Sequence, residues 1–161
     1  MILLSKRCVL AIAAVVDVAL HARPTPVAAK TLAARYRLRP RHLETLLHGL
    51  SNANILKGVR GPKGGYELAR ERRKITVGEI VRTALALRTT DPAEIMARSR
   101  LIKNVIGPSV HRAGATLLAN LDTVTIEELC NDAAAERIVD EEDTVAARIT
   151  EKGKIASNYA I

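Results

Sequence analysis

The first long stretch of the chain is apolar on almost every side. Ser5 is placed to cap a helix that runs to about His21, and the Arg-Pro-Thr-Pro run at 23–26 ends it, because proline disfavours helical geometry in the residue before it. A helix that is apolar nearly all round is buried on more than one side. With two cations before it, the run also matches the pattern of a secretory signal, but Asp17 interrupts it and it is too short to span a bilayer. We therefore expect the central helix of a folded domain and no membrane association.

Two shorter helices follow, and the second has one apolar and one polar face. The pattern predicts a helix from about Val27 to Tyr36, a turn at 38–40, and a helix from about Arg41 to Ala53. The second helix carries four leucines on one face at the spacing i, i+3, i+4, i+7, namely Leu43, Leu46, Leu47 and Leu50. Two helices joined by a short turn, with a polar face on the second, are typical of a helix-turn-helix. Alone this pattern is weak evidence, because any two amphipathic helices match it.

A glycine-rich hairpin is predicted directly after these helices. Residues 55–60 and 65–69 have the pattern of strands on either side of a Gly-Pro-Lys-Gly turn at 61–64. Arg60 and Lys63 give this turn two positive charges. A basic hairpin in this position is typical of the wing of a winged helix, which strengthens the helix-turn-helix interpretation.

The rest of the chain is predicted to be helical. A capping box at Thr76 and Glu79 opens a fourth helix. Three more helices are expected, with an interruption at Gly107-Pro108 between the first two: Asp91 toward Val105, about Ser109 to Leu121, and Thr125 to Leu129. From about Asn131 the chain is rich in alanine and acidic residues, as in a poorly ordered tail.

The net charge of +8 is unevenly distributed. Residues 1–90 hold 17 Lys and Arg against 5 Asp and Glu, a balance of +12, and residues 91–161 hold 8 against 12, a balance of −4. A basic first half indicates a polyanionic partner such as DNA. Aromatic residues are only 2%, with no Trp and no Phe, so stacking of unpaired bases is disfavoured and double-stranded DNA is the predicted ligand.

These patterns predict a mainly α fold, a winged helix-turn-helix with a two-stranded β wing and a long C-terminal dimerisation helix. We assign residues 1–88 to the DNA-binding domain, 89–130 to dimerisation helices, and 131–161 to an acidic, flexible tail. A two-fold homodimer formed by the helix around 109–121 is expected to act on a palindromic operator, because operator symmetry follows protein symmetry.

The residues predicted to contact DNA lie on three parts of the domain. On or just before the recognition helix, they are Arg39, Arg41, His42, Glu44, Thr45 and His48. On the wing, they are Lys57, Arg60, Lys63 and Gly64. Near helix starts, where free backbone amides favour phosphate, they are Ser5, Lys6, Arg7, Lys30 and Thr31. Each has a simpler interpretation as a solvated surface residue. For Glu44 the two interpretations are a hydrogen bond from cytosine N4 and an ion pair with Arg41.

The sequence contains no recognisable catalytic or metal-binding pattern. The glycine-rich segment at 58–65 lacks the GK[ST] end of a P-loop, and the histidines have no metal-ligand spacing, so we expect neither an enzyme nor a metal site. The two cysteines, Cys8 and Cys130, form no CxxC pair, which favours a reducing cytoplasm. Each cysteine is either a buried apolar residue or a redox-active one, and Lys6 and Arg7 beside Cys8 would favour a thiolate.

The wing segment Arg60-Gly61-Pro62-Lys63-Gly64-Gly65-Tyr66-Glu67-Leu68-Ala69-Arg70 closely resembles the wing signature of the Rrf2 family of bacterial transcription regulators. Four further segments are similar to the family's pattern, over about residues 1–130: Asp17 to His21, His42 to Leu47, Ile75 to Val81 and Leu121 to Leu129. The resemblance implies a dimeric winged-helix regulator, with a repressor as the expected type. An alternative it implies is a regulator that works mainly through a protein partner, such as a metabolic enzyme.

The chain also departs from this family. Iron–sulfur members usually carry three closely spaced cysteines before the dimer helix, and residues 88–111 contain none. A cluster needs about four thiolate or equivalent ligands, so we expect no cofactor, and the alternative is a sensor that uses Cys8, Cys130 or both. His42 stands where the family often has tyrosine. Residues 51–54, Ser-Asn-Ala-Asn, replace a more basic turn that contains glycine, which leaves the geometry of this turn open.

Overall fold

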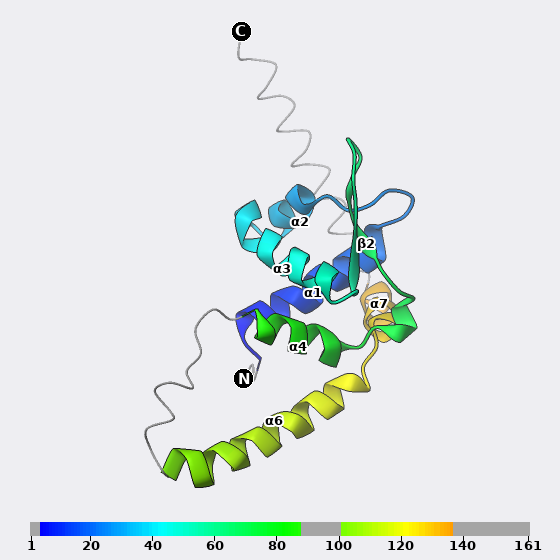
Figure 1. Ribbon diagram of the computed structural model, residues 1–161. Helices are drawn as coiled ribbons and strands as arrows, with labels where there is room; N and C mark the ends of the chain where they lie inside the picture. Colours follow the sequence, from blue (N-terminus) through cyan, green and yellow to red (C-terminus); the bar gives the residue numbers. More distant parts are fainter. Residues whose placement is uncertain (1–3, 88–100, 137–161) are drawn as a thin grey trace.

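The computed structural model describes residues 4–87 and 101–136. Helices pack around one another and a two-stranded hairpin projects from them, as the predicted winged-helix fold class requires (Figure 1). The elements in chain order are α1 (Lys6–His21), α2 (Ala29–Arg35), α3 (Pro40–Asn52), β1 (Leu56–Val59), β2 (Gly65–Leu68), the 3-10 turn η1 (Arg72–Lys74), α4 (Val77–Ala86), the π-helical turn η2 (Ile102–Ile106), α6 (Gly107–Asp122) and α7 (Ile126–Ala135).

Helix α1 runs through the centre of the fold, as its apolar sequence predicted. Its first turn is capped by Ser5, whose hydroxyl oxygen accepts a hydrogen bond from the Cys8 amide at 3.3 Å. The helix contacts α4, α7 and the base of the wing, so it is covered on several sides. Small side chains allow this close packing, since Ala11 and Ala14 are completely buried.

One charged residue is buried in the centre of the fold. Asp17, in the middle of α1, is only 3% exposed. Its carboxylate pairs with the Arg35 guanidinium, lies 3.0 Å from His21 Nδ1, and accepts a hydrogen bond from the Tyr36 hydroxyl at 3.2 Å. Because Arg35 and Tyr36 end α2, this cluster fixes the first helix of the helix-turn-helix to the central helix. From the sequence, Asp17 was seen to interrupt an apolar run and to begin a segment similar to the family's pattern, but it had no predicted partner.

The turns before and after α3 each contain a non-glycine residue in the left-handed region. Arg37 has φ 51° between α2 and α3, and Asn54 has φ 56° after α3. The Ile55 amide then donates to the Leu50 carbonyl at 3.0 Å and closes the end of the helix. Asparagine tolerates this conformation better than most residues, so Asn54 can form this turn without glycine. Within α3, the four leucines predicted to form the apolar face are all buried.

The wing is a regular antiparallel hairpin, and a third segment pairs with β2 near the turn end of its ladder. Leu56 pairs with Leu68 and Val59 with Gly65, close to the predicted strands. Val27, which was expected in a helix, instead exchanges two backbone hydrogen bonds with Tyr66 at 2.9 and 2.8 Å. A Cβ atom at Gly65 would overlap the Val27 carbonyl, so glycine is required for this close approach.

The end of the described chain returns to the same core. Thr76 and Thr125 form a β-bridge, and each caps its helix in a capping box. Ile126 and Cys130 of α7 are buried with the residues of α1. Helix α7 continues to Ala135, so the helix extends past residue 130, where we expected the acidic tail to begin. Residues 137–161 of that tail lie outside the described residues.

Contrary to our prediction, Gly107-Pro108 does not interrupt the helix. The π-helical turn η2 leads directly into α6, which begins at Gly107 and contains Pro108 in its first turn. Proline has no N–H group for the α-helical ladder, and a wider π turn before it lets the chain continue as a helix. Most of the helix expected from Asp91 toward Val105 lies outside the described residues. Within residues 4–87 and 101–136, none of the helices has the length and apolar character needed to cross a membrane.

The buried carboxylate gives a direct test of this packing. Asp17→Asn keeps the shape of the side chain but removes the charge that compensates Arg35. Removing one partner of a buried ion pair is strongly destabilising, so we expect the free energy of unfolding in urea to fall by about 3 kcal/mol. Glu71→Gln is the control, because Glu71 forms its ion pairs at the surface. The urea concentration at the midpoint of unfolding of this variant is expected to stay near that of the wild type. An Asp17→Asn midpoint equal to that of Glu71→Gln would show that the cluster does not stabilise the fold.

Candidate DNA-binding interface

The polar face of α3 is exposed along its whole length. Arg41, Glu44, Thr45, His48 and Asn52 follow one another at the spacing of one helix face, and all five are exposed. Arg39, immediately before the helix, is also exposed. The side chain of His42 lies outside what the structure describes. An α-helix with such a face fits the major groove of B-DNA, where polar side chains reach base edges.

Glu44 forms no ion pair with Arg41 in the described part of the chain. The simpler interpretation of Glu44, as half of an intrahelical ion pair, therefore has no support in the geometry. One turn further, His48 Nδ1 lies 3.3 Å from the Asn52 amide nitrogen. Sequence analysis passed over Asn52, although its spacing of four residues from His48 placed it on the same face.

A shallow groove of about 460 Å³ lies between the recognition helix and the wing. Its lining residues are Glu44, Thr45, His48, Gly49, Asn52, Tyr66 and Leu87. Gly49 allows the Leu87 side chain to pack closely against α3, because a Cβ atom at this position would displace the Leu87 methyl groups. The groove places Tyr66 of β2 beside the predicted base-reading residues of α3, so the two elements form one continuous surface.

The wing tip carries two exposed cations on a turn that only glycine can form. Arg60 and Lys63 are exposed, and Gly61 has φ 117°. Gly64 donates its amide to the Gly61 carbonyl at 2.9 Å, and a Cβ atom at Gly64 would overlap the Val59 carbonyl. This geometry holds the tip narrow, which suits entry of its cations into the minor groove or contact with phosphates.

Lys57, the remaining cation predicted to bind DNA from the wing, already has a partner. It pairs with Glu67, its neighbour on the opposite strand, at 3.1 Å. A surface pair of this kind is weak, but it lowers the net charge that Lys57 offers to DNA. The wing cations without an ion pair in the described residues are therefore those at the tip.

Arg70 anchors the base of the wing. It donates to the Asn54 carbonyl at 3.1 Å, to the Lys74 carbonyl at 3.0 Å, and to both carboxylate oxygens of Glu79 at 3.2 and 3.1 Å. Glu79 is the capping-box residue of α4, so one guanidinium joins the end of α3, the wing and α4. Arg70 is the last residue of the wing signature, but sequence analysis assigned it no role.

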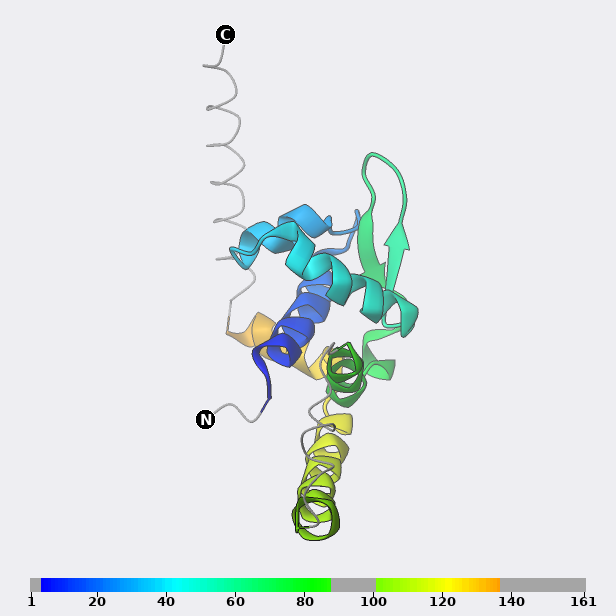
Figure 2. The same ribbon diagram turned by 60° about the vertical axis from the view of Figure 1, so that its left-hand side comes forward.

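Of the predicted phosphate contacts near helix starts, those at the start of α1 lie away from the wing tip. In both views the N-terminus of α1 is the end of that helix farther from the wing, while α6 lies farther away still (Figures 1 and 2). Lys6 is exposed there and Arg7 is half-buried, while the Ser5 hydroxyl is used by the helix cap and by Cys8. Lys30 and Thr31 are exposed in the first turn of α2, close to α3. Any contact made by α1 would thus be with a separate part of the DNA backbone.

The two cysteines are buried and are not part of this surface. Cys8 is 1% exposed and Cys130 is 3% exposed. Burial raises the pKa of the Cys130 thiol, which opposes formation of a thiolate. No group of three or more His, Cys, Asp and Glu suited to a metal ion occurs within residues 4–87 and 101–136.

The fold and this surface together define a winged-helix DNA-binding regulator, and comparisons with known proteins identify the family. A model of the Rrf2 family, described as iron-dependent transcriptional regulators, matches residues 4–132. The chain is 28% identical over 137 residues to the HTH-type transcriptional regulator IscR of Vibrio atlanticus, covering 83% of this chain and 78% of that protein. It is 28% identical over 149 residues to IscR of Pectobacterium atrosepticum, covering 90% and 88%.

Solved structures agree with these sequence matches. IscR of T. potens is 31% identical, with a TM-score of 0.63 over 82% of this chain and 88% of that one. CymR, the global cysteine regulator of B. subtilis, is 27% identical, with a TM-score of 0.58 over 81% and 98%. The chain belongs to the Rrf2 family of transcriptional regulators, as its wing signature indicated.

The wing tip supplies a prediction about affinity. Arg60→Ala is expected to weaken binding to specific and to random duplex alike, because a wing cation mainly neutralises phosphate. The slope of log K against log salt should become flatter by about 1 for each phosphate that the variant no longer neutralises. Fluorescence anisotropy over a salt series measures both effects. Arg73→Ala is the control, since Arg73 is an exposed arginine paired with Glu71 and distant in sequence from the wing tip. A slope and affinity for Arg60→Ala equal to those of Arg73→Ala would exclude the wing tip from the interface.

Proposed function

We propose that this protein is a homodimeric transcriptional repressor that recognises a palindromic operator and binds it without an iron–sulfur cluster. The observation that carries the proposal is the single exposed surface formed by the polar face of α3 and the wing, with exposed cations at the wing tip. The relatives of known structure are named as regulators. Membership of their family supports regulation of transcription by DNA binding, and not catalysis, as the function of this protein. Because the proposed ligand is chromosomal DNA, we place the protein in the cytoplasm.

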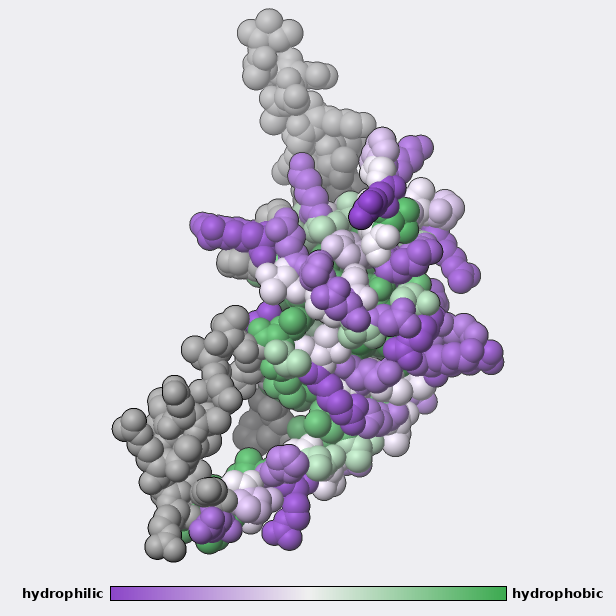
Figure 3. Space-filling model, viewed as in Figure 1, coloured by the Kyte–Doolittle hydropathy of each residue, from purple (hydrophilic) through white to green (hydrophobic). Residues whose placement is uncertain are grey.

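The proposal of a homodimer is supported by the apolar surface of α6 and the turn before it. This helix projects from the body of the fold (Figures 1 and 2), and none of its residues is buried. Leu101 is 60% exposed, Val105 57% and Val110 64%, and hydrophobic residues reach the surface along α6 in Figure 3. Apolar side chains so exposed are stabilised when a second surface covers them. A second copy of the chain, related by a two-fold axis, would cover them with the same surface of its own α6.

A two-fold dimer determines the form of the operator. It presents two recognition helices and two wings related by the same axis, so each half of the operator carries the same sequence on opposite strands. Within each half-site, Glu44 is the side chain whose chemistry is most selective. A carboxylate near phosphates is unfavourable unless it accepts a hydrogen bond, and cytosine N4 is the donor that a major-groove carboxylate prefers.

The proposal that no cluster is needed departs from the description of the family as iron-dependent. It rests on the sequence, which has two cysteines in all and none between residues 88 and 111. Both cysteines are buried in the hydrophobic core, where they fill space as small apolar residues. This packing favours the buried-residue interpretation of Cys8 and Cys130 over a role as cluster ligands or as a redox switch.

Base recognition by Glu44 predicts a change in specificity. Glu44→Ala is expected to relax the preference at one base pair in each half-site, with a loss of discrimination of roughly 1–3 kcal/mol. Non-specific affinity should stay level or rise, because a negative charge has been removed. Selection from a randomised duplex library measures the preference at every position, and Glu67→Ala on the wing is the control carboxylate. An unchanged ranking of operator sequences for Glu44→Ala would show that Glu44 does not read a base.

The dimer predicts the effect of a charge on α6. Val110→Asp places a carboxylate on the exposed apolar face, so the dimer dissociation constant should rise at least about tenfold, the equivalent of 1.4 kcal/mol. Sedimentation velocity measures the association. Arg112→Asp is the matched control, because two residues along a helix turn a side chain by about 200° to the opposite face. Equal association of the two variants would place the dimer interface elsewhere.

A further inference from the structure

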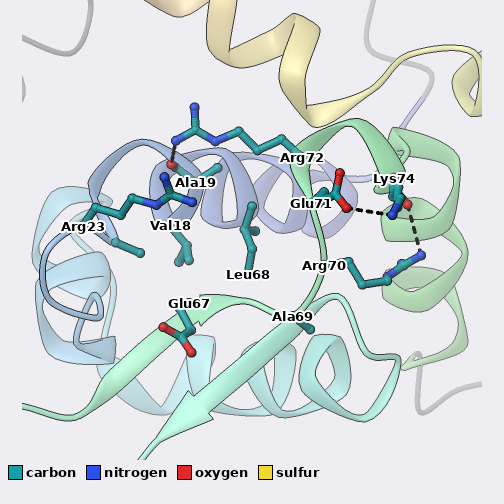
Figure 4. Close-up of a pocket in the computed structure, with 11 residues that line it drawn as sticks. Val18, Ala19, Arg23, Glu67, Leu68, Ala69, Arg70, Glu71, Arg72 and Lys74 are labelled. Atoms are coloured by element: carbon teal, nitrogen blue, oxygen red, sulfur yellow. Dashed lines mark hydrogen bonds and ion pairs between the residues drawn. The ribbon is translucent and has the colours of Figure 1, made fainter.

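A second pocket lies on the other side of the wing base from the recognition helix. Its volume is about 610 Å³, in the range typical of sites for small molecules. It is formed by the end of α1, the end of β2 and the segment that leads into η1 (Figure 4). One part of its wall is apolar, from Val18, Ala22, Leu68 and Ala69, and the rest carries charge.

The charged groups of this pocket are not balanced. Four cations line it, Arg23, Arg70, Arg72 and Lys74, against two carboxylates, Glu67 and Glu71. Both carboxylates already have partners that lie outside the pocket. Glu67 pairs with Lys57, and Glu71 pairs with Arg73 at 2.7 Å as well as with Lys74. Hydrogen bonds from Lys74 and Arg73 lower the pKa of the Glu71 carboxyl.

Two of these arginines have no anionic partner among the residues that the structure describes. Arg70 is occupied by Glu79, but neither Arg23 nor Arg72 has an ion pair within the described ranges. Arg72 donates one N–H group to the Ala19 carbonyl at the end of α1, which leaves other N–H groups of its guanidinium available. Both arginines line this pocket, and Figure 4 shows the Arg72 guanidinium at the Ala19 carbonyl, with Arg23 on the segment that follows α1.

We propose that this pocket binds a small molecule that bears a phosphate group, held by Arg23 and Arg72, with its organic part against the apolar wall. Two positive charges that line one pocket repel each other, and an anion bound in the pocket offsets that repulsion. Phosphate offers acceptor oxygens in several directions and is bound bidentately by arginine. The volume exceeds that of phosphate alone, which is why we assign a phosphate ester rather than the free ion.

The position of the pocket suggests what binding does. It joins the end of α1, the segment that leads to α2, and the base of the wing. A ligand bridging these parts holds the helix-turn-helix in one orientation relative to the wing. This consequence rests on the proposed DNA-binding function, whereas binding of the phosphate ester does not.

The test is calorimetric titration of the full chain with glycerol 3-phosphate, and with inorganic phosphate, at constant ionic strength and without DNA. We expect saturable binding of glycerol 3-phosphate by the wild type. Arg23→Gln should weaken it at least about tenfold, because one of the two guanidinium groups that hold the phosphate is removed. Arg73→Gln is the matched control and should bind as the wild type does. Arg23 is exposed, so Arg23→Gln should keep the wild-type circular dichroism and melting temperature.

Each outcome decides the proposal. Absence of saturable binding by the wild type, or equal binding by Arg23→Gln and the wild type, would overturn it. The other source of phosphate is the DNA backbone. If Arg23→Gln flattens the salt dependence of duplex binding while the wild type binds no glycerol 3-phosphate, the two arginines hold DNA and the small-molecule site is excluded. If neither the wild type nor any variant bound DNA, the proposed function would be contradicted. The titration with glycerol 3-phosphate would still decide the small-molecule proposal, because it is done without DNA.

Discussion

The arrangement of this fold depends on a carboxylate buried in its central helix. Asp17 holds Arg35 and Tyr36 at the end of α2, and the turn that follows leads directly into the recognition helix. A buried charge is costly unless it is paired. Moving α2 away from α1 would leave the Asp17 carboxylate without its partners, so the arrangement in which the two helices are in contact is favoured. Apolar packing alone is tolerant of small shifts. The paired carboxylate therefore gives the helix-turn-helix a defined position that leucines alone would not give.

Three further contacts hold the wing against the rest of the fold, and one of them reaches the central helix directly. The Val27 backbone pairs with Tyr66, the Arg72 guanidinium binds the carbonyl of Ala19, and Arg70 joins the wing base to α4. The recognition helix and the wing thus share one reference element, α1. This is the property that a DNA-binding surface needs, because a helix in the major groove and a hairpin at the neighbouring minor groove must keep a fixed separation.

The parts of the fold that could be predicted are those governed by local patterns. Each of these patterns depends on residues that lie close together in the sequence. They are the Ser5 cap, the leucine face of α3, the hairpin and the Thr76 capping box. The parts that could not be predicted depend on partners far apart in sequence. Nothing local distinguishes Val27 as a strand residue, because its partner Tyr66 is on the wing. The return of Cys130 to the core beside α1 is equally non-local.

The site could be predicted best from the sequence where its residues lie on one regular element. The exposed face of α3 follows from helical spacing, which also included Asn52 although we had not singled it out. The pocket beside Arg23 and Arg72 could not be found in this way, since three separate segments form it. The phosphate contacts expected at the start of α1 stay a prediction, because they depend on the path of the DNA past this end of the helix.

The central claim is that this surface recognises a specific DNA sequence without a metal cofactor. The most direct measurement is the affinity of anaerobically purified, chelator-treated protein for duplex from the region upstream of its own gene, compared with random duplex at the same salt concentration. The account predicts a preference of at least about a thousandfold, the lower end of the range for specific regulators. Equal affinity for the two duplexes, or a preference that appears only when iron is restored, would contradict it.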